Sequence, residues 1–425
     1  MKEARKCAEE LLMFIDKSPS CYHAVANLTG EYDARGFARL YENEVWKPEK
    51  GKKYYTVRND SSVIAFQIPE KIKGFHITAA HSDSPTFKIK ETPEMKAEGH
   101  YVRLNTEKYG GMILSTWLDR PLSIAGRIAV EEDGKIVTKL VNIDRDLCVI
   151  PNLAIHMNRE INKEMEYNPQ VDMLPLYADS REGKGALLRQ AAKAAGVKES
   201  EILGQDLFLY VREKGRILGE NHEYILSPRL DDLQCVYAAN RAFLDTEPEE
   251  FVSVLAVFDN EEVGSGTRQG ADSTFLEDVL WRLAEGLGAD KSTYLAWVAA
   301  SFLISADNAH AVHPNHPERA DPTNRPLLNG GIVIKFHGSQ RYTTDAVTAG
   351  EMKRLCKEAG VPCQTFANRA DIPGGSTLGN ISTAHVSVAS VDIGLPQLAM
   401  HSAVETGGVR DTLYAVKALR EFYAR

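Results

Sequence analysis

Long apolar runs that end in polar clusters are the most regular feature of the chain. Three of them are "GFHITAAHSDSP" (74–85), "FVSVLAVFDNEE" (251–262) and "SFLISADNAHAVHPN" (301–315). Apolar runs without polar alternation predict strands that are buried on both faces, as in a parallel sheet. Helical stretches near 231–245 and 275–299 precede the second and the third strand. This alternation predicts an α/β protein with a mainly parallel sheet.

The pattern changes between the first two of these strands. Residues from about 88 to 222 carry short alternating segments, such as "KLVNIDRDLCVI" and "DLFLYVR", and turns such as "EDGK" (132–135). Period-two alternation between turn residues is typical of antiparallel β structure. We therefore predict a β-rich domain, residues 88–222, inserted into an α/β domain formed by residues 1–87 and 223–425.

Composition excludes several classes of protein. The 425 residues are 43% hydrophobic and carry a formal net charge of −9, so no basic stripe is available for nucleic acid. The N-terminus predicts an amphipathic helix rather than a signal peptide, and the longest apolar stretch, 294–305, is too short to span a bilayer. Six scattered cysteines without CxxC spacing predict small buried side chains rather than disulfides or a thiolate metal site. We expect a cytoplasmic protein that binds neither nucleic acid nor membranes.

Histidine and carboxylate side chains gather at the ends of the predicted strands and at one helix start. In open α/β sheets, ligands bind outside the carboxyl ends of the strands. The candidates are His81 and Asp83, Asp231 and Asp232, Glu261 and Glu262, Asp307, and His401 in "LPQLAMHSAVET". Each feature alone has an ordinary explanation: a surface turn for "HSD", a helix cap for the paired aspartates, a solvated turn for the paired glutamates.

From this set, two histidines and three carboxylates are candidate ligands, and one further carboxylate is a spare that can act as a base. Nitrogen and oxygen donors without thiolates suit catalytic Zn, Mn or Co. One aspartate can bridge two ions held about 3.5–4 Å apart. Of the two adjacent glutamates, one can then be a ligand and the other a base that takes a proton from water. An aspartate two residues after a strand histidine faces the same way and can fix its imidazole.

These motifs, in this order, resemble the M18 family of metalloaminopeptidases, whose best-known members are the aspartyl aminopeptidases. The resemblance covers nearly the whole chain and rests on "AAHSDSP", "YGGMILSTWLDRPLSIAGR", "PNLAIHMNR", "SPRLDD", "VFDNEEVGS", "SADNAHAVHPN", "KFHGSQRYTTDA" and "PQLAMHSAVE". It implies an α/β/α proteolytic domain interrupted by a β-rich domain for dimerisation and substrate access. It also implies hydrolysis of the N-terminal residue from peptides by a homo-oligomer, a dodecamer built from dimers.

Two divalent ions per subunit follow from the same resemblance, with zinc expected and Mn or Co as alternatives. The family pattern implies that His81, Asp231 and Asp307 bind one ion. It implies that Asp231, Glu262 and His401 bind the other, so that Asp231 bridges the pair.

The resemblance also implies roles for residues that are not ligands. Glu261 is the expected general base, and Asp83 supports the imidazole of the first ligand. His156, in the inserted domain, is expected to reach a neighbouring subunit's active site, where it contacts the substrate. Tyr342 is expected to help stabilise the oxyanion. Lys335 is expected near the S1 pocket, where it favours acidic (Asp/Glu) N-termini.

The chain departs from the family pattern at two places. Asp232 stands where the family usually has Asn, and its extra charge is either solvated or alters metal affinity. The stretch "RADIP" (369–373) replaces "RNDTP" near the S1 pocket. Lys335 itself has an ordinary alternative, a solvated lysine at a strand end.

Three alternative functions stay open. An M18-type aminopeptidase can prefer neutral residues. A deacylase or carboxypeptidase-like amidohydrolase would lack the inserted domain with "PNLAIH". A non-catalytic peptide-binding assembly protein should have lost Glu261 or a ligand, and the sequence retains them all.

Overall fold

The computed structural model describes residues 2–179, 185–375 and 377–425. In this part of the chain the largest sheet has nine strands in the order β1-β2-β3-β13-β4-β14-β18-β16-β17. The strands are β1 (Ala38–Arg39), β2 (Lys53–Arg58), β3 (Ser62–Gln67), β4 (Gly74–His81), β13 (Phe251–Phe258), β14 (Phe302–Ala306), β16 (Ile332–Phe336), β17 (Cys363–Ala367) and β18 (Ala389–Gly394). The three apolar runs are β4, β13 and β14, as predicted.

The centre of this sheet is parallel, and its register aligns the strand ends. β13 and β14 flank β4, and both pair with it in parallel, as β18 does with β14. Phe258, the last residue of β13, lies level with His81, the last residue of β4. Ser305 in β14 is level with Ala79, so Asp307, two residues further on, emerges at the same height. The polar residues that follow the three strands therefore meet at one edge of the sheet.

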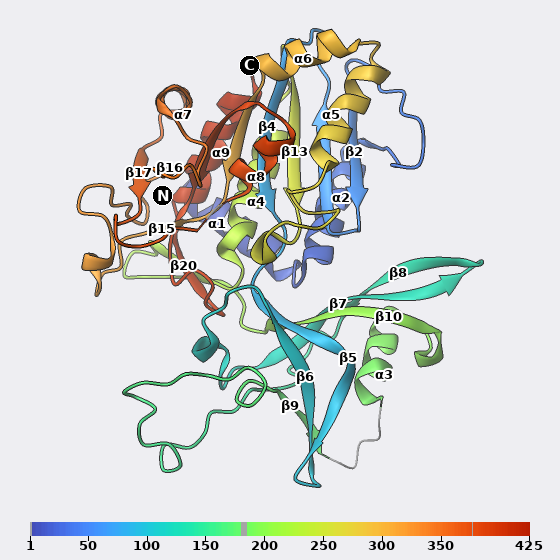
Figure 1. Cartoon of the computed structure of the whole chain (residues 1–425), viewed down its shortest axis with the longest axis vertical. Coiled ribbons are helices and arrows are strands. Elements are labelled where there is room, and N and C mark those ends of the chain that lie inside the picture. The colour runs from blue at the N-terminus through green and yellow to red at the C-terminus, as the bar shows by residue number, and fades with distance from the viewer. Residues whose placement is uncertain (1, 180–184, 376) are drawn as a thin grey trace.

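Helices cover both faces of the nine-stranded sheet (Figure 1). One core contains residues of α1 (Lys2–Asp16), α2 (Cys21–Ala34), α4 (Leu230–Leu244), α7 (Ala346–Glu358) and α9 (Asp411–Tyr423). The core on the opposite face contains residues of α5 (Phe275–Gly286), α6 (Lys291–Ala300) and α8 (Leu378–His385). Successive residues of β13 alternate between the two cores: Val254 packs in one and Leu255 in the other. The α/β/α architecture predicted from the sequence is confirmed.

A second sheet is antiparallel throughout and occupies the lower half of Figure 1. Its order is β8-β7-β10-β5-β6-β9. The strands are β5 (Thr86–Ala97), β6 (Tyr101–Tyr109), β7 (Leu122–Glu132), β8 (Lys135–Asn142), β9 (Leu176–Asp179) and β10 (Ile202–Val211), and α3 (Ala186–Ala195) contributes to its core. The chain enters this sheet after β4 and returns to α4 and β13 afterwards. A β-rich unit thus interrupts the α/β/α unit, as the fold prediction states.

The remaining described elements are a small sheet and four short 3₁₀ helices. A five-stranded sheet runs in the order β11-β12-β20-β19-β15. Its strands are β11 (Arg216–Leu218), β12 (Tyr224–Ser227), β15 (Ala309–His310), β19 (Pro396–Leu398) and β20 (Glu405–Gly408). The short 3₁₀ helices are η1 (Leu114–Trp117), η2 (Glu199–Glu201), η3 (Glu261–Val263) and η4 (Pro317–Arg319). No helix among the described residues is long and apolar enough to cross a membrane.

Two details of the sequence prediction are wrong. The helical stretch predicted over 275–299 is two helices, because the chain breaks after Gly286 and Asp290 caps a new helix by accepting a hydrogen bond from Thr293 N at 2.7 Å. All six cysteines are free, as expected, but Cys363 is exposed at the start of the edge strand β17 while the other five are buried.

Candidate metal centre

The five candidate ligands come from five different segments that converge at the edge of the nine-stranded sheet. His81 ends β4, Asp231 lies in the first turn of α4, and Glu262 belongs to η3, just after β13. Asp307 follows β14, and His401 lies between β19 and β20. The side chains of His81, Asp231 and Glu262 are 1%, 3% and 3% exposed. The surface-turn explanation of "HSD" and the solvated-turn explanation of the paired glutamates are therefore wrong.

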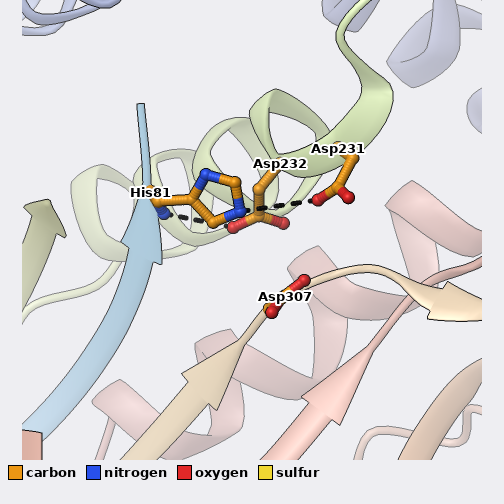
Figure 2. A group of neighbouring side chains, drawn as sticks. All are labelled: His81, Asp231, Asp232 and Asp307. Carbon is orange, nitrogen blue, oxygen red and sulfur yellow. Dashed lines mark hydrogen bonds and ion pairs between the residues drawn. The ribbon is translucent and has the colours of Figure 1, made fainter. Parts of the chain in front are cut away.

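The ligand atoms form groups that share Asp231. One group joins His81, Asp231, Asp232 and Asp307 (Figure 2), and another joins Asp231, Glu262 and His401. Within each group, one ligand atom per residue lies within 4.8 Å of the others. The two oxygens of Asp231 face different histidines: Oδ1 is 3.5 Å from His81 Nε2, and Oδ2 is 3.5 Å from His401 Nε2. Glu262 Oε2 is 3.3 Å from the same nitrogen of His401.

Apart from ion pairs with the two imidazoles, these carboxylates have few partners for their burial. Oδ1 of Asp231 and Oε1 of Glu262 are buried and have no hydrogen-bond partner. An unpaired polar atom in the interior is costly, and a buried carboxylate needs a positive partner. Burial, together with the charge of Asp231, raises the pKa of Glu262 well above its ordinary value. A donor set of this kind, made of imidazole nitrogens and carboxylate oxygens, fits divalent ions such as zinc.

Asp83 ties two of these segments together. Its Oδ1 lies 3.4 Å from His81 Nδ1, and its two oxygens accept hydrogen bonds from Glu261 N and Glu262 N, each at 3.2 Å. Tyr109 of β6 donates its hydroxyl to Asp83 Oδ2 at 2.7 Å. One buried carboxylate thus orients the imidazole at the end of β4 and the backbone of η3 after β13. Holding the second ring nitrogen in this way fixes the orientation of a metal-binding histidine.

Glu261 lies beside the ligands without belonging to either of the two groups that share Asp231. It forms a separate group with His81 and Glu262. Burial, with a contribution from the charge of Asp307, raises the pKa of Glu261 to about 8. A carboxyl group whose pKa is shifted toward neutrality can exchange protons efficiently near neutral pH.

Glu405 is a site residue that the sequence analysis missed. It is 2% exposed and accepts hydrogen bonds from the backbone nitrogens of Asp231 at 3.0 Å and His401 at 2.8 Å. It therefore holds the backbones of two candidate ligands at a fixed separation. The only signal in the sequence is its position four residues after His401 in "HSAVE".

Lys335 and Tyr342 lie next to Asp307. The Lys335 side chain is buried, its Nζ donates to Asn308 O at 2.8 Å, and it lies 3.8 Å from Asp307 Oδ1. Its ammonium is 5.5 Å from the centre of the Tyr342 ring. The alternative of a solvated strand-end lysine is therefore wrong. Burial raises the pKa of the Tyr342 hydroxyl, so this group stays protonated at neutral pH.

The structure does not bring His156 together with the other predicted site residues of its own chain. His156 is exposed on the long loop between β8 and β9, the green loop at the lower left of Figure 1. Three apolar side chains near it are also exposed: Leu153 at 53%, Ile155 at 47% and Met157 at 75%.

A cavity of about 380 Å³ lies between the two large sheets. Asp83, Asp231 and Glu405 line it from the α/β/α unit, and Arg127 and Phe208 line it from the antiparallel sheet. The antiparallel sheet therefore forms part of the surroundings of the candidate ligands.

Buried carboxylates and imidazoles outside the carboxyl ends of parallel strands define the class of the protein, an α/β metallohydrolase. Comparison with known families makes this specific. Residues 14–423 match the family described as "Aminopeptidase I zinc metalloprotease (M18)". The chain belongs to the M18 family of zinc metalloaminopeptidases, which are hydrolases that act as exopeptidases.

Individual relatives match nearly the whole of this chain. The chain is 49% identical to a "Probable M18 family aminopeptidase 2" of Clostridium novyi, with 100% of each chain covered. A protein of the same name from Pseudomonas paraeruginosa is 40% identical, with 97% of each chain covered. Among solved structures, Ape4 in a complex with Nbr1 superposes with a TM-score of 0.96 at 40% identity, covering 99% of this chain and 86% of that chain. The mApe1 dodecamer of S. cerevisiae gives 0.86 at 30% identity, covering 99% and 96%.

Proposed function

We propose that this M18 protein is a dinuclear-metal aminopeptidase that removes acidic (Asp or Glu) residues from the N-termini of peptides. The observation that carries the proposal is the geometry of Asp231. Its two carboxylate oxygens face His81 and His401 separately, each at 3.5 Å. A carboxylate that offers one oxygen to each of two ligand groups can bridge two ions.

The ligand assignment follows from the two groups. His81, Asp231 and Asp307 would hold one ion, and Asp231, Glu262 and His401 the other. Zinc is the ion proposed for both positions, with Mn or Co as alternatives, because the donors are nitrogen and oxygen without sulfur.

Glu261 and Tyr342 each have one role in the proposed mechanism. Two ions in these positions would lower the pKa of a water molecule and polarise the scissile carbonyl. Glu261 takes the proton of the attacking water on a carboxylate oxygen and passes it to the leaving amine. Tyr342, which stays protonated, donates a hydrogen bond to the developing oxyanion. The acidic surroundings attract the free α-amino group of the substrate, which restricts cleavage to the N-terminus.

Lys335 supports the preference for acidic residues. An ammonium group has three donors, and the described residues account for one hydrogen bond, to Asn308 O. A charge-assisted hydrogen bond from a desolvated ammonium to a substrate carboxylate is worth about 1.5–3 kcal/mol. That corresponds to one to two orders of magnitude in discrimination, at about 1.4 kcal/mol per tenfold.

A structural neighbour and the surface around His156 support an assembly of several subunits. mApe1, a structural neighbour, forms a dodecamer. The exposed apolar side chains around His156 are typical of a surface that another subunit covers. We propose a dodecamer built from dimers, in which residues 88–222 provide dimer contacts and substrate access and His156 enters the neighbouring active site. Six free cysteines suit a reducing, cytoplasmic environment.

A panel of aminoacyl p-nitroanilides tests the proposal, with Zn, Mn or Co added to metal-free protein. We expect aspartyl and glutamyl substrates to be cleaved about 10–100-fold better than leucyl or alanyl ones, from the strength of the Lys335 contact. Lys335→Met should lose this preference while keeping metal content, and N-acetylated substrates should resist cleavage. Equal cleavage of leucyl and aspartyl substrates would instead place the chain with aminopeptidases that prefer neutral residues. Absence of any metal-dependent cleavage would contradict the proposed activity itself and favour a peptide-binding role.

A further inference from the structure

Asp232 is a buried carboxylate that the mechanism above does not use. It follows Asp231 directly and stands where the family resemblance leads one to expect Asn. The side chain is 0% exposed, so the idea that its charge is solvated is wrong. Figure 2 shows it pointing into the space between His81, Asp231 and Asp307, and one of its oxygens belongs to the same ligand group.

The hydrogen bonds of Asp232 do not account for its charge. Oδ2 accepts a hydrogen bond from His81 N at 3.2 Å, a contact that an Asn oxygen would make equally well. Oδ1 is buried without a hydrogen-bond partner. The Cys235 thiol lies one turn further along α4; it donates to Asn308 Oδ1 at 3.2 Å and also interacts with the Asp232 carboxylate, and as a neutral group it does not balance the charge. A fully buried carboxylate with one unpaired oxygen is thus part of a group of ligand atoms.

Neighbouring charges make the anion unfavourable in the absence of a cation. Asp231 and Asp307, two further carboxylates, belong to the same group of ligand atoms as Asp232. A buried carboxylate of this kind is destabilising unless a positive charge accompanies it. The surrounding donor set provides the place for such a charge.

The two ion positions are unequal when Asp232 is counted. The group around His81 holds three aspartates, Asp231, Asp232 and Asp307, whereas the group around His401 holds Asp231 and Glu262. His401 is also 31% exposed, while His81 is 1% exposed. The Lys335 ammonium, 3.8 Å from Asp307 Oδ1, offsets one of these anions, and the charge of Asp232 compensates for it. The exclusion of water then favours tighter binding of a divalent ion at the His81 position.

We propose that the charge of Asp232 is directed at the ion held by His81, Asp231 and Asp307, and makes this position bind divalent ions more tightly than the His401 position. The inference rests on the two-ion site of the proposed function. In this account Asp232 is a positioning residue of the metal centre: it sets which ion stays bound and which one exchanges.

The test measures metal affinity directly. Metal-free wild type, Asp232→Asn and Asp411→Asn are titrated with Mn²⁺ and with Zn²⁺ by isothermal calorimetry. Asp411 is an equally buried control, because its oxygens accept hydrogen bonds from Asn329 N at 2.7 Å and Gly331 N at 2.9 Å, away from the ligand groups. We expect two unequal sites in wild type, and a loss of about 10–100-fold at the tighter site in Asp232→Asn, the range seen for groups that support metal ligands. Asp411→Asn should bind both ions as wild type does.

Thermal unfolding of the metal-free proteins shows whether Asp232 has only a structural role. Metal-free Asp232→Asn should unfold at the wild-type temperature or above it, because the Asn oxygen keeps the hydrogen bond from His81 N and the side chain cannot become a buried charge. A clear drop in this temperature, or unchanged affinity at both sites, would overturn the inference.

Asp231→Ala, titrated in parallel, separates this inference from the proposed function. If wild type binds no pair of ions, or Asp231→Ala keeps both, the two-ion site fails. If wild type binds two ions, Asp231→Ala loses them and Asp232→Asn binds both as tightly as wild type, then the role of Asp232 fails while the two-ion site stands.

Discussion

Asp83→Ala should weaken metal binding although Asp83 is not a proposed ligand. The Asp83 carboxylate lies 3.4 Å from His81 Nδ1 and accepts hydrogen bonds from Glu261 N, Glu262 N and the Tyr109 hydroxyl. Removing it leaves His81 Nδ1 with only the backbone carbonyl of Asp83, at 3.1 Å, and leaves two partly buried backbone N–H groups without their acceptor. Partners of this kind typically change metal affinity by about 10–100-fold. That range corresponds to about 1.4–2.7 kcal/mol of binding free energy.

The same substitution should also lower the stability of the metal-free protein. A buried donor left unsatisfied costs about 1–3 kcal/mol. Because Glu261 N and Glu262 N are only partly buried, we expect the low end of this range for each, and a total loss of about 2 kcal/mol. Asp83→Asn is the matched control, because its amide oxygen can still accept a hydrogen bond. This variant should lose less metal affinity and less stability than Asp83→Ala.

Competition with a chelating dye measures the affinity, and urea unfolding of the chelated protein measures the stability. The expected order of affinity is wild type, then Asp83→Asn, then Asp83→Ala. Wild-type zinc affinity in Asp83→Ala would refute the reasoning, because the imidazole and η3 would then be held in place without this carboxylate.

The remaining predictions concern the proton acceptor, the shared ligand, the subunit contact and the response to acid. Glu261→Gln should lower kcat by about 10²–10⁴-fold while metal content stays at the wild-type level, and an active, metal-replete variant would exclude Glu261 as the base. Asp231→Ala should lose both ions and His401→Ala mainly one, as measured by metal analysis per subunit; equal losses would contradict the shared ligand. His156→Ala should cut activity, and mixing it with Glu261→Gln should restore part of the activity after subunit exchange; no recovery despite exchange would exclude action across the interface. His76 is stacked between Phe251 and Phe422, with ring centres 4.1 and 4.5 Å away, and burial lowers its pKa to about 4. As the pH falls below about 6.5, this imidazole is protonated in the unfolded chain but not yet in the folded one. The free energy of unfolding should therefore fall by about 3 kcal/mol between pH 6.5 and pH 4. His76→Gln should show a shallower decline in urea unfolding over this range, and an unchanged slope would contradict the assignment.

The strand ends of the nine-stranded sheet could be predicted because the information is local. β4, β13 and β14 are apolar runs without alternation, and the residue that ends each run is visible in the sequence. Their meeting at one edge follows from parallel pairing alone. The break between α5 and α6 was missed because "GLGAD" (286–290) lies inside a stretch whose apolar residues continue on both sides.

The environment of each side chain could not be predicted in the same way. Glu405 acts through backbone nitrogens of Asp231 and His401, 174 and 4 residues away, and no residue pattern encodes such a contact. The burial of Asp232 and Lys335 depends on how α4 and β16 pack against their neighbours. A charged residue in the sequence is usually solvated, so only the packed structure shows that these two are not.

Residue types and their order still limited the site to a few candidates. The sequence and its family resemblance predict five ligands, and the structure brings their ligand atoms into two groups that share Asp231: His81, Asp231, Glu262, Asp307 and His401. Their role as ligands stays a prediction. The position of His156 in an assembly also stays a prediction, because it concerns contacts between chains.

A crystal structure of the zinc-loaded protein, with anomalous diffraction recorded at the zinc edge, tests the central claim most directly. The account predicts two anomalous peaks per chain, about 3.5–4 Å apart, with one oxygen of Asp231 toward each. The peak beside His81 and Asp307 should persist at lower zinc concentration than the peak beside Glu262 and His401. A single peak, or two peaks of which only one contacts Asp231, would contradict the account.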